Sequence, residues 1–224
     1  VGRRIGRSGR ARAGTSLNVV TLVLASASPA RLATLQAAGI EPVVVVSDVD
    51  EDAALAVATA QAGHELSVPA QVAELALAKA RDVVGKVDRS SLPGEVLVLG
   101  CDSLLEVDGV AQGKPWEPDI ARERWRAMRG GTGVLHTGHY LVRLPLAGEP
   151  RMVSAVSSTQ VSFADLDDDE IDAYVATGEP LQVAGAFTID GIGGAFITAI
   201  SGDHHGVVGL SLPVLRSLVR ELGL

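Results

Sequence analysis

The sequence contains little cysteine and few aromatic residues, and each scarcity excludes a class of protein. The single cysteine of the 224 residues, Cys101, excludes an internal disulfide framework and leaves too few thiolates for a cysteine zinc site. Because a chain without disulfides needs no oxidising compartment, we expect it to reside in the cytoplasm. Aromatic residues make up only 3% of the chain, which leaves little material for platforms that stack nucleic-acid bases.

Positive charge is scarce outside the amino terminus. The net charge of −8 argues against a nucleic-acid duplex as partner, because neutralising phosphates takes a basic surface; small anions remain possible ligands. No run approaches the ~18 apolar residues of a membrane span, so we expect no membrane partner. Residues 1–16 hold five arginines, no acid and no apolar core of a signal peptide. We expect residues 1–17 to be a disordered extension, with a genuine basic tail as the alternative, and residues 18–224 to form the folded domain.

Apolar, β-rich runs alternate with helical patterns, which is typical of an α/β domain. The 47% of hydrophobic residues can form a substantial core, and no repeat or linker divides the chain, so we expect its halves to share one sheet system. The expected strands are 18–25, 42–46, 95–99, 134–144 and 152–163, with a hairpin turning at Asp108-Gly109 and a glycine-rich strand pair over 184–200. The expected helices are 29–38, 68–84, 118–128, 167–178 and 213–222.

The stretch LASASPARL, residues 24–32, joins a buried strand to a helix. The first N–H groups of a helix are unpaired and carry partial positive charge, which attracts phosphate. Ser26 and Ser28 add hydroxyl groups, and Arg31 in the first turn has the fork shape that binds phosphate oxygens. The alternative is structural: Ser28 caps the helix and Arg31 is solvated.

Asp102 follows the apolar strand EVLVLG and should therefore lie where α/β folds place their ligands. A turn-capping aspartate is the alternative. If Asp108-Gly109 forms a two-residue turn, counting backward places Ser103 opposite Lys114, and Asp102 opposite Pro115. That register brings an ammonium group beside the carboxylate, either as part of a site for metal, water and phosphate or as a plain surface ion pair.

Two further charged residues are candidates for the same site. Lys79 shares a helical stripe with the apolar residues Val72 and Leu75, so its stem lies on the buried side; it either enters a phosphate pocket or extends to solvent. Glu51 lies in the acidic run 48–52 and offers the oxygen ligands that Mg²⁺ or Mn²⁺ prefers, although such a loop is often only solvated.

The histidines do not predict a zinc site. Strand alternation should send His136 and His139 to opposite faces, and the adjacent His204 and His205 likewise diverge. The sequence also has no nucleophile elbow, Walker A sequence or dinucleotide-binding fingerprint.

A family resemblance covers residues 20–222. The chain resembles the Maf family of nucleoside triphosphate pyrophosphatases, its actinobacterial members most of all. The matching segments, in order, are LASASPARLATL, VDED, LALAKA, LGCDSLLEVDG, GKP, HTGH, DEIDAYVATGEPLQVAGAFTIDGIGGAFI and GDHHGVVGLSLPVL.

The resemblance implies a two-lobed α/β fold around a deep cleft, similar to that of inosine triphosphate pyrophosphatases, with a mixed sheet and flanking helices. It also implies hydrolysis of a nucleoside triphosphate to the monophosphate and pyrophosphate with a divalent metal, Mg²⁺ or Mn²⁺. The implied roles are proton acceptor and metal ligand for Asp102, metal ligand or water-positioning acid for Glu51, and phosphate contacts for Ser26, Ser28, Arg31, Lys79 and Lys114.

Three positions depart from the family's specificity patterns. Members selective for thymidine and uridine triphosphates usually have arginine, threonine and glutamine where this chain has Ala30, Ser103 and Asp190. Members acting on 7-methylguanosine triphosphate usually have tryptophan, glutamine and glutamate there. Ser103 and Asp190 are therefore expected to contact the substrate, while neither base preference transfers.

Two other functions remain as alternatives. One is the removal of damaged or modified nucleotides. The other is a nucleotide-sensing regulator of cell division that binds without turnover, since the family name comes from a septation phenotype. A homodimer is an alternative to a monomer.

Overall fold

The computed structural model describes residues 19–224, so the expected extension over residues 1–17 lies outside the described part. A seven-stranded mixed sheet forms the centre, in the order β2-β1-β3-β5-β6-β7, with β4 paired to β3. β1 pairs in parallel with β2 and β3, and the other pairs are antiparallel. The strands are β1 (Val20–Ala25), β2 (Val43–Val44), β3 (Glu95–Val107), β4 (Val110–Gln112), β5 (Thr132–Leu144), β6 (Arg151–Phe163) and β7 (Ile197–Ser201).

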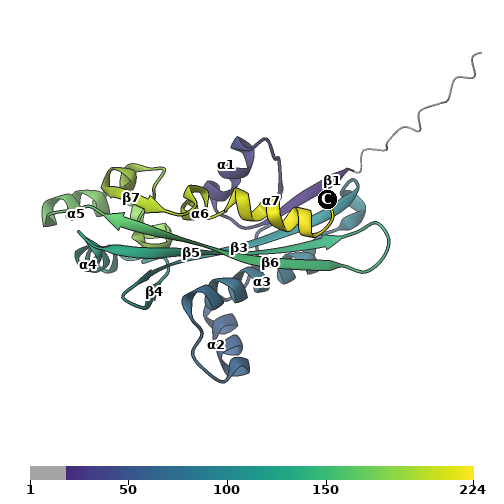
Figure 1. Ribbon diagram of the computed structural model, residues 1–224, viewed down its shortest axis with the longest axis horizontal. Helices are drawn as coiled ribbons and strands as arrows, with labels where there is room; N and C mark the ends of the chain where they lie inside the picture. The colour runs from purple at the N-terminus through teal and green to yellow at the C-terminus, as the bar shows by residue number, and fades with distance from the viewer. Residues whose placement is uncertain (1–18) are drawn as a thin grey trace, which may run out of the picture.

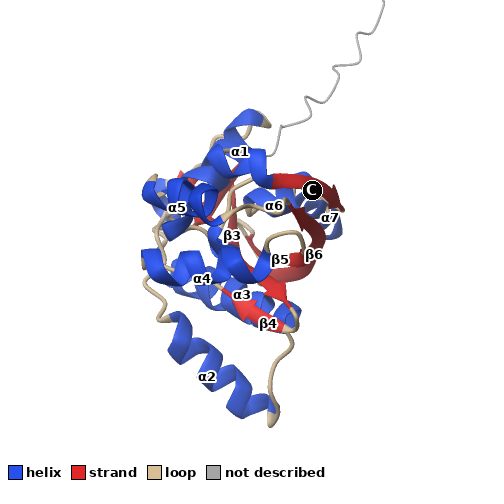
Figure 2. Ribbon diagram, turned by 90° about the vertical axis from the view of Figure 1, so that its left-hand side faces the viewer, coloured by secondary structure: helices blue, strands red, loops and turns tan. Residues whose placement is uncertain are grey.

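Helices cover both faces of this sheet (Figure 1). α1, α6 and α7 lie on one face, while α3 lies on the other, and α2 extends outward from the body beside α3 (Figures 1 and 2). The helices are α1 (Pro29–Ala37), α2 (Glu51–Ala62), α3 (Val68–Lys86), α4 (Pro118–Met128), α5 (Asp168–Ala176), α6 (His204–Val208) and α7 (Leu212–Glu221). Short 3-10 turns are η1 (Arg89–Ser91), η2 (Glu179–Gln182), η3 (Ala184–Ala186) and η4 (Ile192–Phe196).

The hydrophobic core divides into three clusters. One surrounds Trp125 at the end of the sheet that carries α4 and α5. The other two lie on opposite faces at the β1 end, around Leu99 beneath α7 and around Val98 beneath α3. The prediction of an α/β fold with a mixed sheet and flanking helices is confirmed. Among the described residues, no helix is both long and apolar enough to cross a membrane.

α3 packs unusually close to the sheet at two glycines. A Cβ atom built on Gly100 of β3 would lie 2.2 Å from the carbonyl oxygen of Ala76, and one on Gly138 of β5 would lie 2.2 Å from that of Val72. Real Cβ contacts are never so short, so only glycine fits at either position. This close packing fixes the height of α3 above the strands and hence the position of Lys79, one turn after Leu75.

Two expectations about local structure were wrong. Residues 184–200 are not a strand pair, since they form η3, η4 and the first residues of β7. The acidic run 48–52 is not a simple loop, because Asp50 caps α2 by accepting a hydrogen bond from the Ala53 amide, and Glu51 is the first residue of that helix. Capping by Asp50 starts the helix in the acidic run, and turn formation outweighs the apolar pattern in residues 184–196.

Candidate active site

Asp102 lies in the interior of β3, just past the point where the parallel strand ends. The last β1–β3 pair is Ala25 with Gly100, and two residues later Asp102 pairs with Gly138 of β5. Its residue surface is 5% exposed. The turn-capping alternative is therefore wrong, and Asp102 lies at the carboxyl end of the parallel part of the sheet, where such folds bind ligands.

The ammonium group of Lys79 lies between two carboxylates. Its Nζ atom is 2.5 Å from Oδ1 of Asp102 and 2.6 Å from Oε1 of Glu51. The Lys79 side chain is 13% exposed, so it does not extend to solvent. Glu51, whose side chain is 52% exposed, contacts the Lys79 ammonium group from the solvent side. Residues from α2, α3 and β3 thus converge on one nitrogen atom.

The electrostatic balance at Asp102 favours proton uptake. Burial raises the pKa of its carboxyl group, while the positive charges of Lys79 and Arg31 oppose that rise without cancelling it. A carboxylate whose pKa is raised toward the working pH is a better proton acceptor than an ordinary surface aspartate.

Arg31 is buried rather than solvated, with 9% of its surface exposed. Its guanidinium donates hydrogen bonds to the carbonyl oxygens of Gly209 at 2.7 Å and Cys101 at 2.9 Å, and to the hydroxyls of Ser26 at 3.1 Å and Ser103 at 3.0 Å. All four acceptors are neutral, and Arg31 has no ion pair within residues 19–224. A buried positive charge without a carboxylate partner favours the approach of an anion.

The two serines of the opening stretch have different positions. The side chain of Ser28 caps α1 by accepting from the Arg31 amide at 3.4 Å, as the structural alternative predicted. Ser26 is buried beside the Arg31 guanidinium and accepts from the Ser28 amide at 3.2 Å. Ser103 contacts Thr137 at 2.8 Å, oxygen to oxygen. The start of α1 and the residues around Asp102 therefore belong to one polar network.

Lys114 stands apart from this network. The hairpin has the predicted register at Val107 and Val110, but its ladder ends at Leu105–Gln112. Because the ladder stops there, the expected pairing of Ser103 with Lys114 does not form, while on its other side β3 pairs Ser103 with Thr137 of β5. The Lys114 side chain is exposed, with its Nζ 5.0 Å from the centre of the Trp116 ring, and makes no ion pair in the described chain.

Asp190 is exposed and lines a separate cavity of about 310 Å³ between α1 and α6. Ala30, Thr34, His204 and His205 line the same cavity. Two of the three positions that depart from the family patterns, Ala30 and Asp190, therefore face one space, while Ser103 lies beside Arg31.

Comparisons with known proteins identify the family of this chain. A model of the family described as "Maf: Maf-like protein" matches residues 21–222. The chain belongs to the Maf family. A protein of Leifsonia xyli subsp. xyli is 57% identical over 201 residues, covering 90% of this chain and 92% of the relative. Proteins of Salinispora tropica (55% identity over 203 residues; 91% of this chain, 84% of the relative) and Rhodococcus opacus (49% over 205; 92% and 94%) are also similar. All three relatives are named "Nucleoside triphosphate pyrophosphatase".

Two carboxylates of this Maf chain, those of Asp102 and Glu51, supply some of the ligands that a hard divalent cation needs. Asp102 and Glu51 each place an oxygen within 2.6 Å of one atom, the Lys79 nitrogen, so both reach a common point. Within residues 19–224, no group of three or more histidine, cysteine or acidic side chains is arranged to hold a metal. Two carboxylates are nevertheless what Mg²⁺ commonly takes from a protein when substrate phosphates and water supply the other ligands.

Sequence reasoning missed two polar residues that organise this Maf site. Thr137, which is fully buried, links Ser103 to the carbonyl oxygen of Gly206 by a 2.8 Å hydrogen bond. The carboxylate of Glu179 organises the segment before and after Asp190, as it accepts hydrogen bonds from the Thr188 hydroxyl and the Gly193 amide. Neither residue belongs to a local sequence pattern that predicts its role, because both act through contacts with residues distant in the sequence or in an irregular segment.

Proposed function

We propose that this protein hydrolyses a nucleoside triphosphate to the nucleoside monophosphate and pyrophosphate. The observation that carries the proposal is the buried Asp102 carboxylate, bound to Lys79 and near the unpaired charge of Arg31. The names of the Leifsonia, Salinispora and Rhodococcus relatives support the same activity.

The triphosphate would bind where positive charge converges. Arg31 supplies a buried charge, and Ser26 and Ser28 supply hydroxyls at the start of α1, whose free N–H groups favour phosphate. Lys79 would neutralise charge near Asp102, and the exposed Lys114 would move onto the outer phosphates. Cationic side chains held in fixed positions stabilise the transition state most where negative charge develops, which here is on the leaving pyrophosphate.

Asp102 would act as the proton acceptor. Water attacks the α-phosphorus, the bond from that phosphorus to the bridging oxygen breaks, and pyrophosphate leaves with the electron pair. The proton of the attacking water passes to the Asp102 carboxylate, whose pKa is raised by burial. Glu51 would orient the water from the exposed side of Lys79.

Asp102 and Glu51 would also hold a divalent cation, Mg²⁺ or Mn²⁺, together with the substrate phosphates. When bound, such a cation lowers the pKa of water and offsets phosphate charge.

The cavity beside Asp190 would receive the base. Ala30 and Thr34 form its α1 wall, and an ionised Asp190 accepts hydrogen bonds from base N–H groups but donates none. Ser103 would contact the substrate through its hydroxyl next to Arg31.

We further propose a cytoplasmic location. Cys101 is fully buried, and burial raises the pKa of its thiol to about 12, so the residue stays a protonated thiol. This inert thiol needs no oxidising compartment.

A panel of canonical and modified triphosphates, assayed for pyrophosphate and for orthophosphate, tests the function. We expect pyrophosphate with the wild type and its loss in Asp102→Asn, with the fold retained on circular dichroism. Orthophosphate release would place cleavage at another bond. Tight binding without any product would favour the alternative of a nucleotide-sensing regulator of cell division, whereas selective turnover of modified nucleotides would favour the alternative of removing damaged or modified nucleotides.

A further inference from the structure

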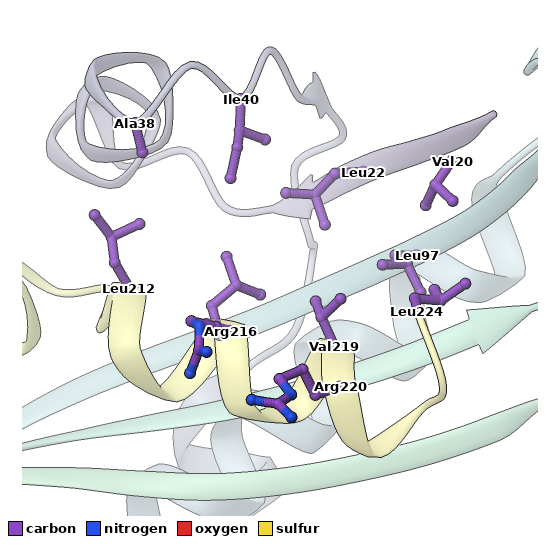
Figure 3. Close-up of a pocket in the computed structure, with 11 residues that line it drawn as sticks. Val20, Leu22, Ala38, Ile40, Leu97, Leu212, Arg216, Val219, Arg220 and Leu224 are labelled. Atoms are coloured by element: carbon purple, nitrogen blue, oxygen red, sulfur yellow. The ribbon is translucent and has the colours of Figure 1, made fainter. Parts of the chain in front are cut away.

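A second, apolar cavity of about 610 Å³ lies between α7 and the β1–α1 segment. Neither Asp102 nor Lys79 lines it. Aliphatic side chains form its walls, among them Leu22, Ile40, Leu215 and Val219. Figure 3 shows these walls facing one another, with Leu212 and Val219 rising from α7 toward Ile40 and Leu22.

Two arginines accompany this apolar surface. Arg216 and Arg220 lie one turn apart on α7, and both line the cavity (Figure 3). Both are exposed, and neither has an ion pair or a side-chain hydrogen bond to any residue of the described range. By contrast, Arg143 nearby on β5 is bound to Glu95 at 2.7 Å. The two arginines therefore place positive charge beside the aliphatic cavity with no acidic partner in the described chain.

We propose that this cavity binds a medium-chain fatty acid anion, with the hydrocarbon chain between α7 and β1 and the carboxylate on Arg216 and Arg220. The volume falls in the range of roughly 300–1,000 Å³ that small-molecule sites occupy. The cavity wall contributes no hydroxyl, carboxylate or aromatic ring, so its chemistry matches a saturated chain. The guanidinium groups match a carboxylate, which they bind through paired N–H donors.

The charges disfavour the other occupants. Residues 1–16 carry five arginines and no acid, so their charge does not complement that of Arg216 and Arg220. A second copy packed across a two-fold axis would add two more arginines, and no acid from the cavity lining, to the same interface. A nucleotide base would lose its hydrogen bonds against purely aliphatic walls.

Calorimetric titration of the full chain with octanoate, decanoate and dodecanoate, each below its micelle concentration, tests the proposal. We expect saturable binding whose dissociation constant falls by up to about fourfold for each added methylene, because each one leaves water. The alcohol of the same length should bind at least about tenfold more weakly, because it lacks the charge that pairs with arginine.

Variants separate the two halves of the site. Arg216→Gln and Arg220→Gln should each weaken dodecanoate binding about tenfold, and Val219→Trp should also weaken it by placing an indole ring in the path of the hydrocarbon chain. Arg126→Gln, at an exposed arginine of α4, is the matched control and should bind like the wild type. Thermal melting monitors folding of each variant, and the arginine variants keep the test valid if Val219→Trp does not fold.

Three results would overturn the proposal. The first is the absence of saturable heat with dodecanoate, and the second is equal affinity for acid and alcohol. The third is self-association of the chain, seen by sedimentation, that Val219→Trp abolishes, which would make a second copy the occupant. Because binding is measured directly, failure here leaves the proposed hydrolysis untouched.

Discussion

The carbonyl oxygen of Val72 occupies the space that a side chain on Gly138 would need, 2.2 Å from the position of its Cβ atom. Val72 and Lys79 belong to the same helix, and Gly138 pairs directly with Asp102 in the sheet. The closeness of helix and strand therefore sets the distance between the ammonium group and the buried carboxylate.

Gly138→Ala should consequently lower both stability and activity. The added methyl group forces α3 away from β5, and overpacking of this kind costs roughly 1–3 kcal/mol in the free energy of unfolding. Gly85→Ala is the control on the same helix, since a Cβ at Gly85 meets nothing within 4 Å and alanine favours helix by up to ~1 kcal/mol. Denaturant unfolding and pyrophosphate release would measure both effects. An unchanged Gly138→Ala protein would show that α3 is free to shift.

Arg31→Lys should destabilise the protein although it preserves the charge. The guanidinium joins four oxygens from the β1–α1 connection, β3 and the segment after α6, and a lysine ammonium reaches at most part of that set. Losing charged hydrogen bonds in a buried place costs on the order of 2–4 kcal/mol. Arg81→Lys, at an exposed arginine of α3, should change little. Equal melting temperatures for the two variants would refute this structural role.

Much of the fold was predictable because strong, regular patterns dominate it. The helix 118–128 and the turn at Asp108-Gly109 were predicted at the residues where they occur, since proline, apolar spacing and turn chemistry agree there. β3 joins the predicted strand 95–99 to the first arm of the predicted hairpin, because long-range pairing with β5 sustains the strand through Gly100 and Asp102. Local sequence cannot report such pairing.

The site was predictable in its composition but only partly in its geometry. Charge on an apolar stripe identified Lys79, and a carboxylate after a buried strand identified Asp102, because both patterns are local. Burial of Arg31 against Gly209, 178 residues away, depends on tertiary packing. The position of Lys114 also depends on tertiary packing, because it is set by the residue at which the β3–β4 ladder ends and not by the turn alone.

His139 should make stability depend on pH. It is 1% exposed, its Nε2 accepts the Ser211 amide at 2.8 Å, and its Nδ1 has no hydrogen-bond partner among residues 19–224. Burial, with the charge of Arg31, lowers the pKa of His139 from the ordinary 6.5 to about 4. Between these values the unfolded chain binds a proton that the folded chain does not. The contribution of neutral His139 to the free energy of unfolding is therefore complete above pH 6.5 and is lost as the pH falls toward 4.

Urea unfolding at pH 7 and at pH 4.5 measures this effect. His139→Gln keeps an acceptor for the Ser211 amide but does not titrate, so it should lose less stability than the wild type between the two pH values, by up to about 3 kcal/mol. His64→Gln, at an exposed histidine, is the control and should follow the wild type. Parallel pH curves for His139→Gln and the wild type would mean that the imidazole is protonated in the folded state.

Glu179→Gln should loosen the segment that carries Asp190. The carboxylate accepts four hydrogen bonds, which come from the Tyr174 and Thr188 hydroxyls and from the amides of Ile192 and Gly193. These bonds lower the pKa of Glu179 even though burial, the largest single influence, raises it. A glutamine of the same shape turns one acceptor into a donor that faces another donor, which costs roughly 1–3 kcal/mol.

The consequence for substrate choice follows from the position of Asp190 at the cavity between α1 and α6. If that cavity receives the base, Glu179→Gln should raise KM for the preferred triphosphate and reduce discrimination among bases, with a smaller effect on kcat because Asp102 and Lys79 lie elsewhere. Glu170→Gln changes a capping acid of α5 in the same half of the chain and serves as the control. A fall in kcat with unchanged discrimination would instead tie Glu179 to the reacting phosphates and move the base away from Asp190.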